Sequence, residues 1–392
     1  MAVVGCETIR SDMTAEPPLP TDPLHALVTR EIAAAGGWLG FDDFMALALY
    51  APGLGYYTRG ATVFGAMPQG LRDASGQLAG AGSDFVTAPE LSPLFGWTLA
   101  RQVAQALQAT GTDEVWEFGA GSGALALQLL DALKAQGVVL RRYTIVDLSA
   151  TLKARQQAAL VAHADVVHWA SALPAQMQGV VVGNEVLDAM PVKLLARVQG
   201  VWHERGVAWD ATTGALTWAD RATDLRPPTD VDGSHDYLTE LHQQGEAFVR
   251  TLGARLVRGA AFLIDYGFPE HEYYHVQRHM GTVMCHRAHQ ADADPLQDVG
   301  QKDITAHVNF TGVAVAAQDA GLEVLGYTSQ AHFLINCGLP ALMEAADLPT
   351  RVAAHKLLAE HEMGELFKVI GLTQGPYWDA MGFAHGDRTH RL

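Results

Sequence analysis

Short apolar segments alternate with amphipathic segments between residues 112 and 193, and this alternation constrains the fold more than any other feature of the chain. The apolar segments DEVWEFG, RRYTIVD, ADVVHWA and GVVVGNE have strand length, whereas ALALQLLDALKAQ and ATLKARQQAALVA have helical spacing. Such alternation favours a parallel sheet with right-handed crossovers in an α/β fold. Ligands of these sheets bind beyond the carboxyl ends of the strands, so polar residues at those ends are the first candidates for a site.

The flanking regions have other patterns. Apolar spacing predicts helices over 24–36, 41–50 and 91–110 before the alternating region. After it, period-two alternation over 194–221 predicts a β-meander. We then expect a helix over 236–256, the strand GAAFLIDYG, a long segment 268–310 without a clear period, and a final strand, LFKVIGL.

Composition excludes several classes of function. The net charge of −17 argues against binding nucleic acid through phosphate contacts, which needs a basic face. No apolar run approaches the roughly 20 residues that span a bilayer, so we expect no membrane insertion. The N-terminal segment has no signal-peptide centre, and the three cysteines form no metal-ligand or disulfide pattern, so we expect a reducing cytoplasm.

A glycine-rich loop follows the first strand of the alternating region. WEFGAGSGALALQLL places Gly119, Gly121 and Gly123 between a strand and a helix, where backbone amides can approach a ligand closely. Glu117 precedes the glycines; it would repel a pyrophosphate but suits a cation such as the ammonium of S-adenosylmethionine. Asp147 ends the second strand and is placed to accept the ribose hydroxyls of a nucleoside cofactor. The same pattern loosely matches a dinucleotide fingerprint, G-x-G-x-x-A, so a nicotinamide-dependent oxidoreductase remains an alternative.

Several further motifs accompany this loop in a fixed order. The chain resembles the MidA-like class I S-adenosylmethionine-dependent methyltransferases, a family that includes a mitochondrial complex I assembly factor that methylates an arginine of a core subunit. The resemblance covers roughly residues 37–372 and is carried by GFDDFMALALYAPGLGYY, GSDFVTAPELSPLFG, WEFGAGSG, VDLS, VVGNEVLDAMPV, LIDYG, YYHVQRHMGTVMCHRAH, QKDITAHVNF and ELFKVIGL. It departs from the family at Asn309, where an aspartate is common, and around 65–82, which is longer than usual.

The resemblance implies a Rossmann-like, seven-stranded class I methyltransferase sheet with an N-terminal helical cap and an inserted meander and loop region. It also implies that Glu117, the three glycines and Asp147 bind S-adenosyl-L-methionine. We therefore expect a flexible tail (1–23), a helical cap (24–111) with a flexible loop (61–83), a methyltransferase domain (112–375) with insertions at 194–256 and 268–310, and a C-terminal tail (376–392).

Polar side chains also end the third and fourth strands of the alternating region. Trp169 is a candidate wall for the adenine ring, with ordinary packing as the alternative. Asn184 offers an amide donor and acceptor to the cofactor. Glu185 and Asp188 are candidate catalytic acids, because carboxylates can orient a guanidinium bidentately, although Asp188 could simply cap a helix.

The remaining candidates are spread along the chain. His307 is a candidate proton acceptor, with loop anchoring as the alternative. His271, His275 and His279 could share one helical face, but no acid or cysteine completes a ligand set, so we expect no metal. The candidate substrate-binding residues are Tyr56, Tyr57, Asp265, Tyr266 and Asp303.

Together with the family resemblance, these residues predict a protein arginine methyltransferase. Its expected partner is a protein with an accessible arginine, such as a subunit of respiratory complex I, and a homodimer is one assembly compatible with the sequence. The alternatives are a methyltransferase for a small molecule or another nucleophile, and a weakly catalytic assembly factor on a methyltransferase scaffold.

Overall fold

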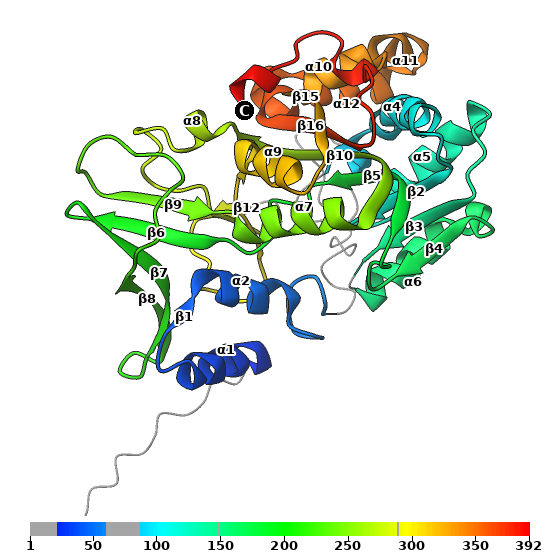
Figure 1. Cartoon of the computed structure of the whole chain (residues 1–392). Helices are drawn as coiled ribbons and strands as arrows, with labels where there is room; N and C mark the ends of the chain where they lie inside the picture. Colours follow the sequence, from blue (N-terminus) through cyan, green and yellow to red (C-terminus); the bar gives the residue numbers. More distant parts are fainter. Residues whose placement is uncertain (1–21, 60–86, 148, 288–289) are drawn as a thin grey trace, which may run out of the picture.

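A mixed sheet of eight strands lies at the centre of the chain (Figure 1). The structure is a computed structural model that describes residues 22–59, 87–147, 149–287 and 290–392 of the 392-residue chain. The strands of the central sheet are β2 (Glu114–Phe118), β3 (Arg142–Val146), β4 (Val167–Ala170), β5 (Met177–Asn184), β10 (Leu256–Phe268), β14 (Val308–Asn309), β15 (Glu323–Ser329) and β16 (Phe367–Gln374).

Seven of these strands follow one another in the order β15-β16-β10-β5-β2-β3-β4. The block from β10 to β4 is parallel, as the strand–helix alternation predicts, and β16 is antiparallel to both of its neighbours. The two-residue strand β14 pairs with the end of β10, so the sheet has eight strands rather than the expected seven. The carboxyl ends of β2, β3, β5 and β10 therefore meet at one edge.

Helices cover both faces of the central sheet. On one face α4 (Leu94–Thr110) and α5 (Ala124–Ala135) pack against the strands, and on the other lie α7 (Gln243–Arg255) and α9 (Phe310–Asp319) (Figure 1). Val180, Val181 and Val182 of β5 are consequently fully buried, because both faces of this strand are covered. Further helical elements surround this layer: α3 (Ala88–Leu91), α6 (Ala150–Ala159), α8 (Glu270–Tyr273), α10 (Gln330–Asn336), α11 (Leu339–Ala345), α12 (Leu348–Leu358), a π-helical turn (Glu360–Gly364) and 3₁₀ turns at Val161–His163, Met381–Phe383 and Thr389–Arg391.

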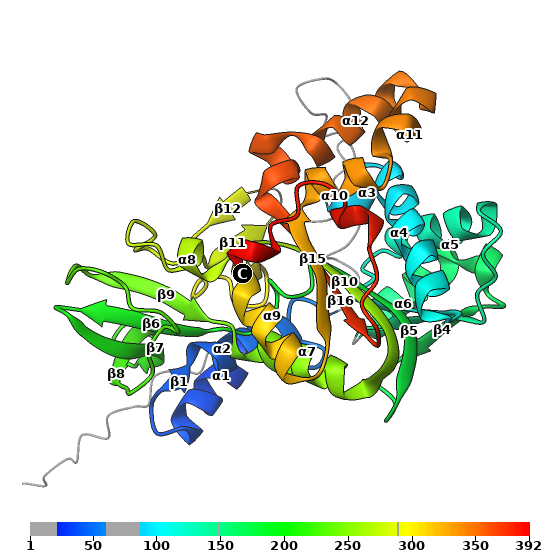
Figure 2. The same ribbon diagram turned by 45° about the horizontal axis from the view of Figure 1, so that its top comes forward.

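A second, antiparallel sheet of five strands projects from one side of the molecule (Figure 2). Its members β6, β7 and β8 form the expected meander, and β1 and β9 complete it. Helices α1 and α2 pack with this sheet around a core of their own, which includes Phe41, Phe44 and Val207. These elements are α1 (Pro23–Ala34), β1 (Leu39–Gly40), α2 (Phe41–Tyr50), β6 (Lys193–Val198), β7 (Val201–Asp210), β8 (Ala215–Ala222) and β9 (Tyr237–Leu241).

A third sheet of three short strands lies within the expected insertion at 268–310. Its strands are β11 (Met284–Arg287), β12 (Gln290–Asp292) and β13 (Asp303–Thr305), in the order β12-β11-β13. Ile304 of β13 and Cys285 of β11 pack into the same core as α1 and α2. The two insertions and the first two helices therefore share one core beside the central sheet.

Several expected boundaries need correction. The helix expected over 236–256 is a strand, β9, followed by α7, because its first residues pair with β6. The expected cap 24–111 is divided, since α4 buries Phe95, Leu99 and Val103 in the core of the central sheet. The segment 376–392 packs against β15: Phe383 is buried, and the Asp387 carboxylate accepts the Tyr327 N–H at 2.9 Å. The expected flexible loop 61–83 and most of the tail 1–23 lie outside the described residues.

Candidate functional site

The glycine loop joins β2 to α5 at the edge where the parallel strands end. Gly119, Gly121 and Gly123 have φ values of 64°, 51° and 86°, in the left-handed region that favours glycine. A Cβ atom at Gly121 would meet no other atom within 4 Å, so this backbone borders open space. The Gly119 N–H donates to the Val146 carbonyl at 3.2 Å, which ties the loop to β3. Among the three glycines, Gly121 is the one with open space beside its backbone, whereas a Cβ atom at Gly123 would lie 3.5 Å from Gln156.

Glu117 lies below this loop and is almost completely buried. The Tyr143 hydroxyl donates to Glu117 Oε2 at 2.6 Å. Burial raises the pKa of Glu117 to about 7, the Tyr143 hydrogen bond opposes this, and the charge of Asp147 adds to it. A cationic ligand in contact with Glu117 would lower that pKa again. The carboxyl group therefore suits an ammonium group.

Asp147 lies at the end of β3 and is held at both of its carboxylate oxygens. The Ser149 N–H donates to Oδ1 at 3.0 Å, and Gln156 Nε2 donates to Oδ2 at 2.9 Å. Trp169, the expected adenine wall, is not among the residues that line the two hollows described below. Its indole N–H instead donates to Gln156 Oε1 at 2.9 Å. Sequence reasoning missed Gln156, because a glutamine inside a helix carries no motif.

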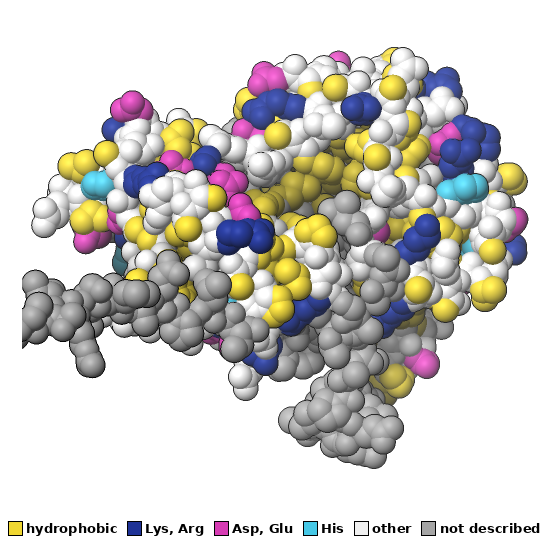
Figure 3. Space-filling model, turned by 90° about the horizontal axis from the view of Figure 1, so that it is seen from below, with side chains coloured by type: hydrophobic (Ala, Val, Ile, Leu, Met, Phe, Trp, Pro, Cys, Tyr) yellow, Lys and Arg dark blue, Asp and Glu magenta, His cyan; other side chains and the backbone are white. Residues whose placement is uncertain are grey.

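Two adjoining hollows lie at this edge of the sheet. The smaller has a volume of about 100 Å³ and the larger about 390 Å³, and both are lined by Tyr57, Gly119, Gly121 and Glu185. The surface seen from below is hollowed, with hydrophobic side chains on the floor of the depression (Figure 3). The smaller hollow is lined in addition by Tyr56, Thr87, Pro89, Glu90, Glu117, Ala120, Ser122, Ala124, Leu125, Asn184 and Asp303, and the larger by Tyr50, Phe118, Val146, Asp147, Ser149, Leu152, Leu173, Val186, Ala189, Met190, Pro191 and Phe248.

The segment after β5 forms a tight turn around Asp265. Asp265 Oδ2 accepts the backbone N–H groups of residues 186, 187 and 188 at 3.2, 2.9 and 3.2 Å, and Oδ1 accepts the Tyr266 N–H at 2.9 Å. Glu185 begins this turn with a φ of 53°, an uncommon conformation for a residue with a side chain. Asp265 is buried, and its carboxylate is occupied by these amides. Asp265 therefore positions the turn and does not face a substrate, which corrects the expectation that it binds substrate.

Glu185 and Asp188 are brought together by this turn. Burial raises the pKa of Glu185 to about 8, and the charge of Asp188 contributes, while hydrogen bonds from Asn184 and the Ala88 amide oppose the shift. Burial also raises the pKa of Asp188 to about 6, against the hydrogen bond from the Tyr266 hydroxyl. Glu185 lines both hollows, whereas Asp188 lies behind it, almost completely buried.

Asn184 extends this acidic group into the smaller hollow. Its Nδ2 donates to Glu185 Oε1 at 2.9 Å. Its buried Oδ1 has no hydrogen-bond partner among the described residues, and neither does Asp188 Oδ1. Buried acceptors of this kind are costly unless a donor satisfies them. Because Asn184 lines the smaller hollow, its Oδ1 suits a ligand that brings an N–H group.

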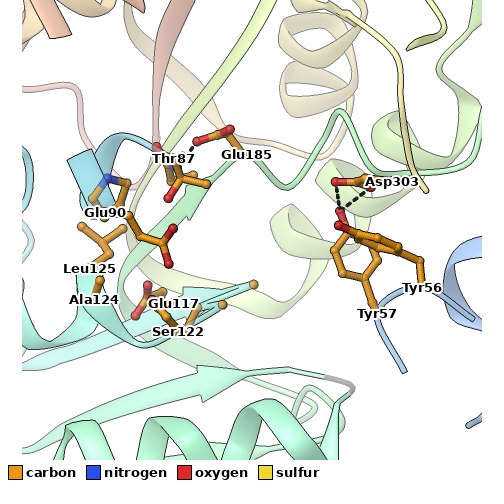
Figure 4. A pocket seen from close by; sticks show the side chains of 15 residues that line it. Tyr56, Tyr57, Thr87, Glu90, Glu117, Ser122, Ala124, Leu125, Glu185 and Asp303 are labelled. Carbon is orange, nitrogen blue, oxygen red and sulfur yellow. Dashed lines mark hydrogen bonds between the residues drawn. The ribbon is translucent and has the colours of Figure 1, made fainter. Parts of the chain in front are cut away.

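Tyr57 and Asp303 lie on the opposite side of the smaller hollow from Glu185, Glu90 and Glu117 (Figure 4). The Tyr57 hydroxyl donates to both carboxylate oxygens of Asp303, at 2.8 and 2.9 Å. Tyr56 packs edge-on against Tyr57 with ring centroids 5.0 Å apart, and both tyrosines line the hollow as expected.

Tyr50, which sequence reasoning did not single out, stacks on Tyr57 at a centroid distance of 5.6 Å. Its hydroxyl donates to the Ala189 carbonyl at 2.8 Å, so it connects α2 to the segment that follows β5. Tyr50 is the last residue of the amphipathic helix α2, where an aromatic side chain is usually part of the core. The sequence alone therefore offers no reason to single it out.

His307 does not line either hollow among the described residues. Its ring packs against Tyr266 and Phe268, with centroid distances of 5.2 and 5.4 Å, and burial lowers its pKa to about 4. Tyr266 likewise lies behind the turn, with its hydroxyl on Asp188. The structure therefore corrects the expectation that His307 accepts the departing proton and that Tyr266 contacts substrate.

The other sequence features have structural explanations. Asn309 caps α9, since its Oδ1 accepts the Gly312 N–H at 3.3 Å, a role that asparagine and aspartate share. Helix α8 ends at Tyr273, so His271, His275 and His279 do not share a helical face. Within the described part of the chain, no group of three potential ligands could hold a metal ion, and no helix is long and apolar enough to cross a membrane.

The arrangement fits S-adenosyl-L-methionine. Glu117 and the glycine loop would hold its amino-acid portion, and Asp147 would accept the ribose hydroxyls. The apolar side chains of the larger hollow, such as Leu152 and Leu173, offer a surface for the adenine ring. No Lys, Arg or His lines either hollow among the described residues, so nothing there would repel the positive charge of the sulfonium.

Comparisons with known proteins agree with this fit. The model of a family described as "Putative S-adenosyl-L-methionine-dependent methyltransferase" matches residues 98–328. Curated relatives include two named "Protein arginine methyltransferase NDUFAF7, mitochondrial". The one from Danio rerio is 26% identical, covering 79% of this chain and 75% of its own; the one from Homo sapiens is 25% identical, covering 90% and 84%.

Solved structures of two Burkholderia thailandensis chains also match. One, described as a "likely methyl transferase" and bound to S-adenosyl-homocysteine, is 51% identical, covers 94% of this chain and 96% of its own, and gives a TM-score of 0.87. A native structure from the same organism is 50% identical over the same shares, with a TM-score of 0.83. The present chain therefore belongs to this family of S-adenosyl-L-methionine-dependent methyltransferases, the MidA-like enzymes that its motifs resemble.

Proposed function

We propose that this methyltransferase transfers its methyl group to an arginine side chain of a partner protein. The observation that carries the proposal is the charge of the two hollows. Their lining includes five acids (Glu90, Glu117, Asp147, Glu185 and Asp303) and, among the described residues, no basic side chain. Glu117 and Asp147 are accounted for by the cofactor. The other three acids, Glu90, Glu185 and Asp303, exceed what an uncharged methyl acceptor would require. Three carboxyl groups around one hollow suit a cationic acceptor instead.

The turn formed by residues 185–188 after β5, here called the catalytic turn, can orient a guanidinium group. When bound, S-adenosyl-L-methionine supplies a methyl group on a positively charged sulfonium. Glu185 Oε1 and Oε2 can accept N–H groups of the planar guanidinium fork, and Asn184 Oδ1 offers one further acceptor. Holding one guanidinium nitrogen in line with the methyl group supplies much of the acceleration, because positioning converts a bimolecular step into a unimolecular one.

Glu185 can also take the proton that the acceptor nitrogen loses. Burial raises the pKa of Glu185 to about 8 in the protein without ligand, so its carboxyl group is largely protonated until a cation binds. A bound guanidinium lowers that pKa, so Glu185 is ionised when the acceptor is in place and is ready to accept a proton at Oε1 or Oε2. Asp188, held by the Tyr266 hydroxyl behind Glu185, adds negative charge that favours this transfer.

The curated relatives support a protein acceptor, since they are named as protein arginine methyltransferases. The first acceptors to test are subunits of respiratory complex I, which the resemblance in sequence implies.

The proposal can be tested by binding. The protein is saturated with S-adenosyl-homocysteine and titrated, under NMR detection, with Nα-acetyl-arginine amide or with the citrulline analogue, which has the same shape but no charge. We expect the arginine compound alone to shift resonances around the hollows, and Glu185→Gln to weaken this binding. Equal binding of the two compounds, or of neither, would instead favour a small-molecule acceptor or a scaffold role.

A further inference from the structure

Gln156 connects the two loops that form the cofactor site. It lies on α6 and its side chain is fully buried. Its Nε2 donates to the Gly121 carbonyl at 3.0 Å and to Asp147 Oδ2 at 2.9 Å. Its Oε1 accepts the Trp169 indole N–H at 2.9 Å. One side chain thus bonds the glycine loop, the acid that ends β3, and the residue near the end of β4.

The partners determine which way the amide of Gln156 points. A backbone carbonyl and a carboxylate only accept hydrogen bonds, and an indole N–H only donates one. The NH₂ group must therefore face Gly121 and Asp147, and the oxygen must face Trp169. No other side chain of this length supplies two donors and one acceptor: glutamate would place an acceptor against two acceptors, and methionine would make none of the bonds.

The space around Gln156 also requires a precise fit. A Cβ atom at Gly123 would lie 3.5 Å from both Cα and Cγ of Gln156, so the start of α5 packs directly against this side chain. The Ser149 N–H meanwhile holds the other oxygen of Asp147 at 3.0 Å. The carboxylate is therefore fixed from two directions, and Gln156 is the part of that support that also reaches the glycine loop.

We propose that Gln156 is a positioning residue for cofactor binding, which sets the Asp147 carboxylate and the Gly121 backbone at a fixed distance from each other. Asp147 is expected to hold the ribose of the cofactor, and the glycine loop is expected to hold its amino-acid portion. Gln156 thereby couples the two halves of the site that must grip one molecule. The Trp169 indole N–H holds the Gln156 side chain in place through its hydrogen bond to Oε1. This bond explains a tryptophan at position 169 without any contact with adenine.

The test compares Gln156→Glu, Gln156→Met and wild type by calorimetry with S-adenosyl-homocysteine and by steady-state kinetics. Hydrogen bonds to charged groups contribute about 1.5–3 kcal/mol, so we expect the dissociation constant to rise about 10- to 100-fold in both variants. The KM for S-adenosyl-L-methionine should rise in parallel. The kcat at saturating cofactor should stay within about threefold of wild type, because the catalytic turn is untouched.

Gln102→Glu is the matched control. Gln102 is also a fully buried helical glutamine with two hydrogen bonds, from its Nε2 to Gln105 Oε1 at 3.0 Å and from the Gly382 N–H to its Oε1 at 2.8 Å. It lies on α4 and lines neither hollow, so its variant should keep the wild-type dissociation constant even if its melting temperature falls. A folded Gln156→Met variant that binds S-adenosyl-homocysteine as tightly as wild type would overturn the proposal, and so would an equal loss of affinity in Gln102→Glu.

Discussion

Replacing Asp265 by asparagine should reduce turnover without weakening cofactor binding. The carboxylate accepts four backbone N–H groups, three of them from consecutive residues of the catalytic turn. Asparagine has no charge and keeps one acceptor oxygen, which can face either the three N–H groups of residues 186–188 or the Tyr266 N–H. Its NH₂ group then faces the remaining N–H donors and cannot accept a hydrogen bond from them. The turn that holds Glu185 at a φ of 53° would then lose its main support.

The size of the effect follows from these bonds. A hydrogen bond to a charged acceptor is stronger than one to a neutral acceptor by about 1 kcal/mol, so four bonds set an upper limit of about 4 kcal/mol. If half of this loss appears in the transition state, kcat falls by about 30-fold. The dissociation constant for S-adenosyl-homocysteine should change by less than about threefold, because Asp265 lines neither hollow.

The assay measures methyl transfer under saturating cofactor, together with calorimetric binding and thermal unfolding. Asp387→Asn is the control, since Asp387 also holds a backbone segment, through the N–H groups of Tyr327 and Thr389, but far along the chain from the turn. Asp387→Asn should keep the wild-type kcat. A folded Asp265→Asn variant with unchanged kcat would refute the idea that Asp265 positions the catalytic acids, as would a collapse of cofactor binding.

Four further predictions concern the buried acids and His307. Glu117→Gln should weaken S-adenosyl-homocysteine binding by at least about tenfold by calorimetry, whereas Tyr143→Phe, which removes only the hydrogen bond to Glu117, should weaken it less; the reverse order would contradict the assignment. The kcat/KM for the acceptor should rise between about pH 6 and pH 8 as Asp188 and Glu185 ionise, and a flat profile would show that neither charge is needed. Burial raises the pKa of Glu185 from 4.5 to about 8 in the folded protein, so its contribution to the free energy of unfolding is fully present below pH 4.5 and is lost as pH rises to about 8. The Glu185→Gln variant, unfolded in denaturant at a series of pH values, should lack this decline in the free energy of unfolding. His307→Gln should keep kcat within about threefold, and a loss of several orders of magnitude would restore His307 as the base.

The sequence was informative where local pattern and chemistry coincide. Alternating strands and helices predicted the parallel part of the central sheet, and the glycine loop with Glu117, together with the family resemblance, predicted the cofactor. The burial of Glu117 and its contact with Tyr143 could not be predicted, because they depend on how β2 and β3 pair. The strand β9 was mistaken for helix since its pairing partner, β6, lies about 40 residues earlier in the chain.

The roles of the acids were harder to predict than their presence. Glu185 and Asp188 follow β5, and Asp265 lies near the carboxyl end of β10, so the sequence placed all three near the same edge of the sheet. Only the structure separates an acid that faces the hollow, Glu185, from one whose oxygens are occupied by backbone amides, Asp265. Gln156 and Tyr50 had no sequence signal, because buried polar or aromatic residues in amphipathic helices resemble core residues.

The chemical identity of the methylated product tests the proposed arginine methylation most directly. The purified protein is incubated with S-adenosyl-L-methionine labelled in its methyl group and with the soluble and membrane-associated proteins of its host, complex I subunits included. The labelled proteins are then hydrolysed and their amino acids separated. We expect label in methylarginine from a protein of the host, and loss of this label with Glu185→Gln. Label confined to a small molecule or to another amino acid, or methylarginine formed equally well by the Glu185→Gln variant, would contradict this expectation.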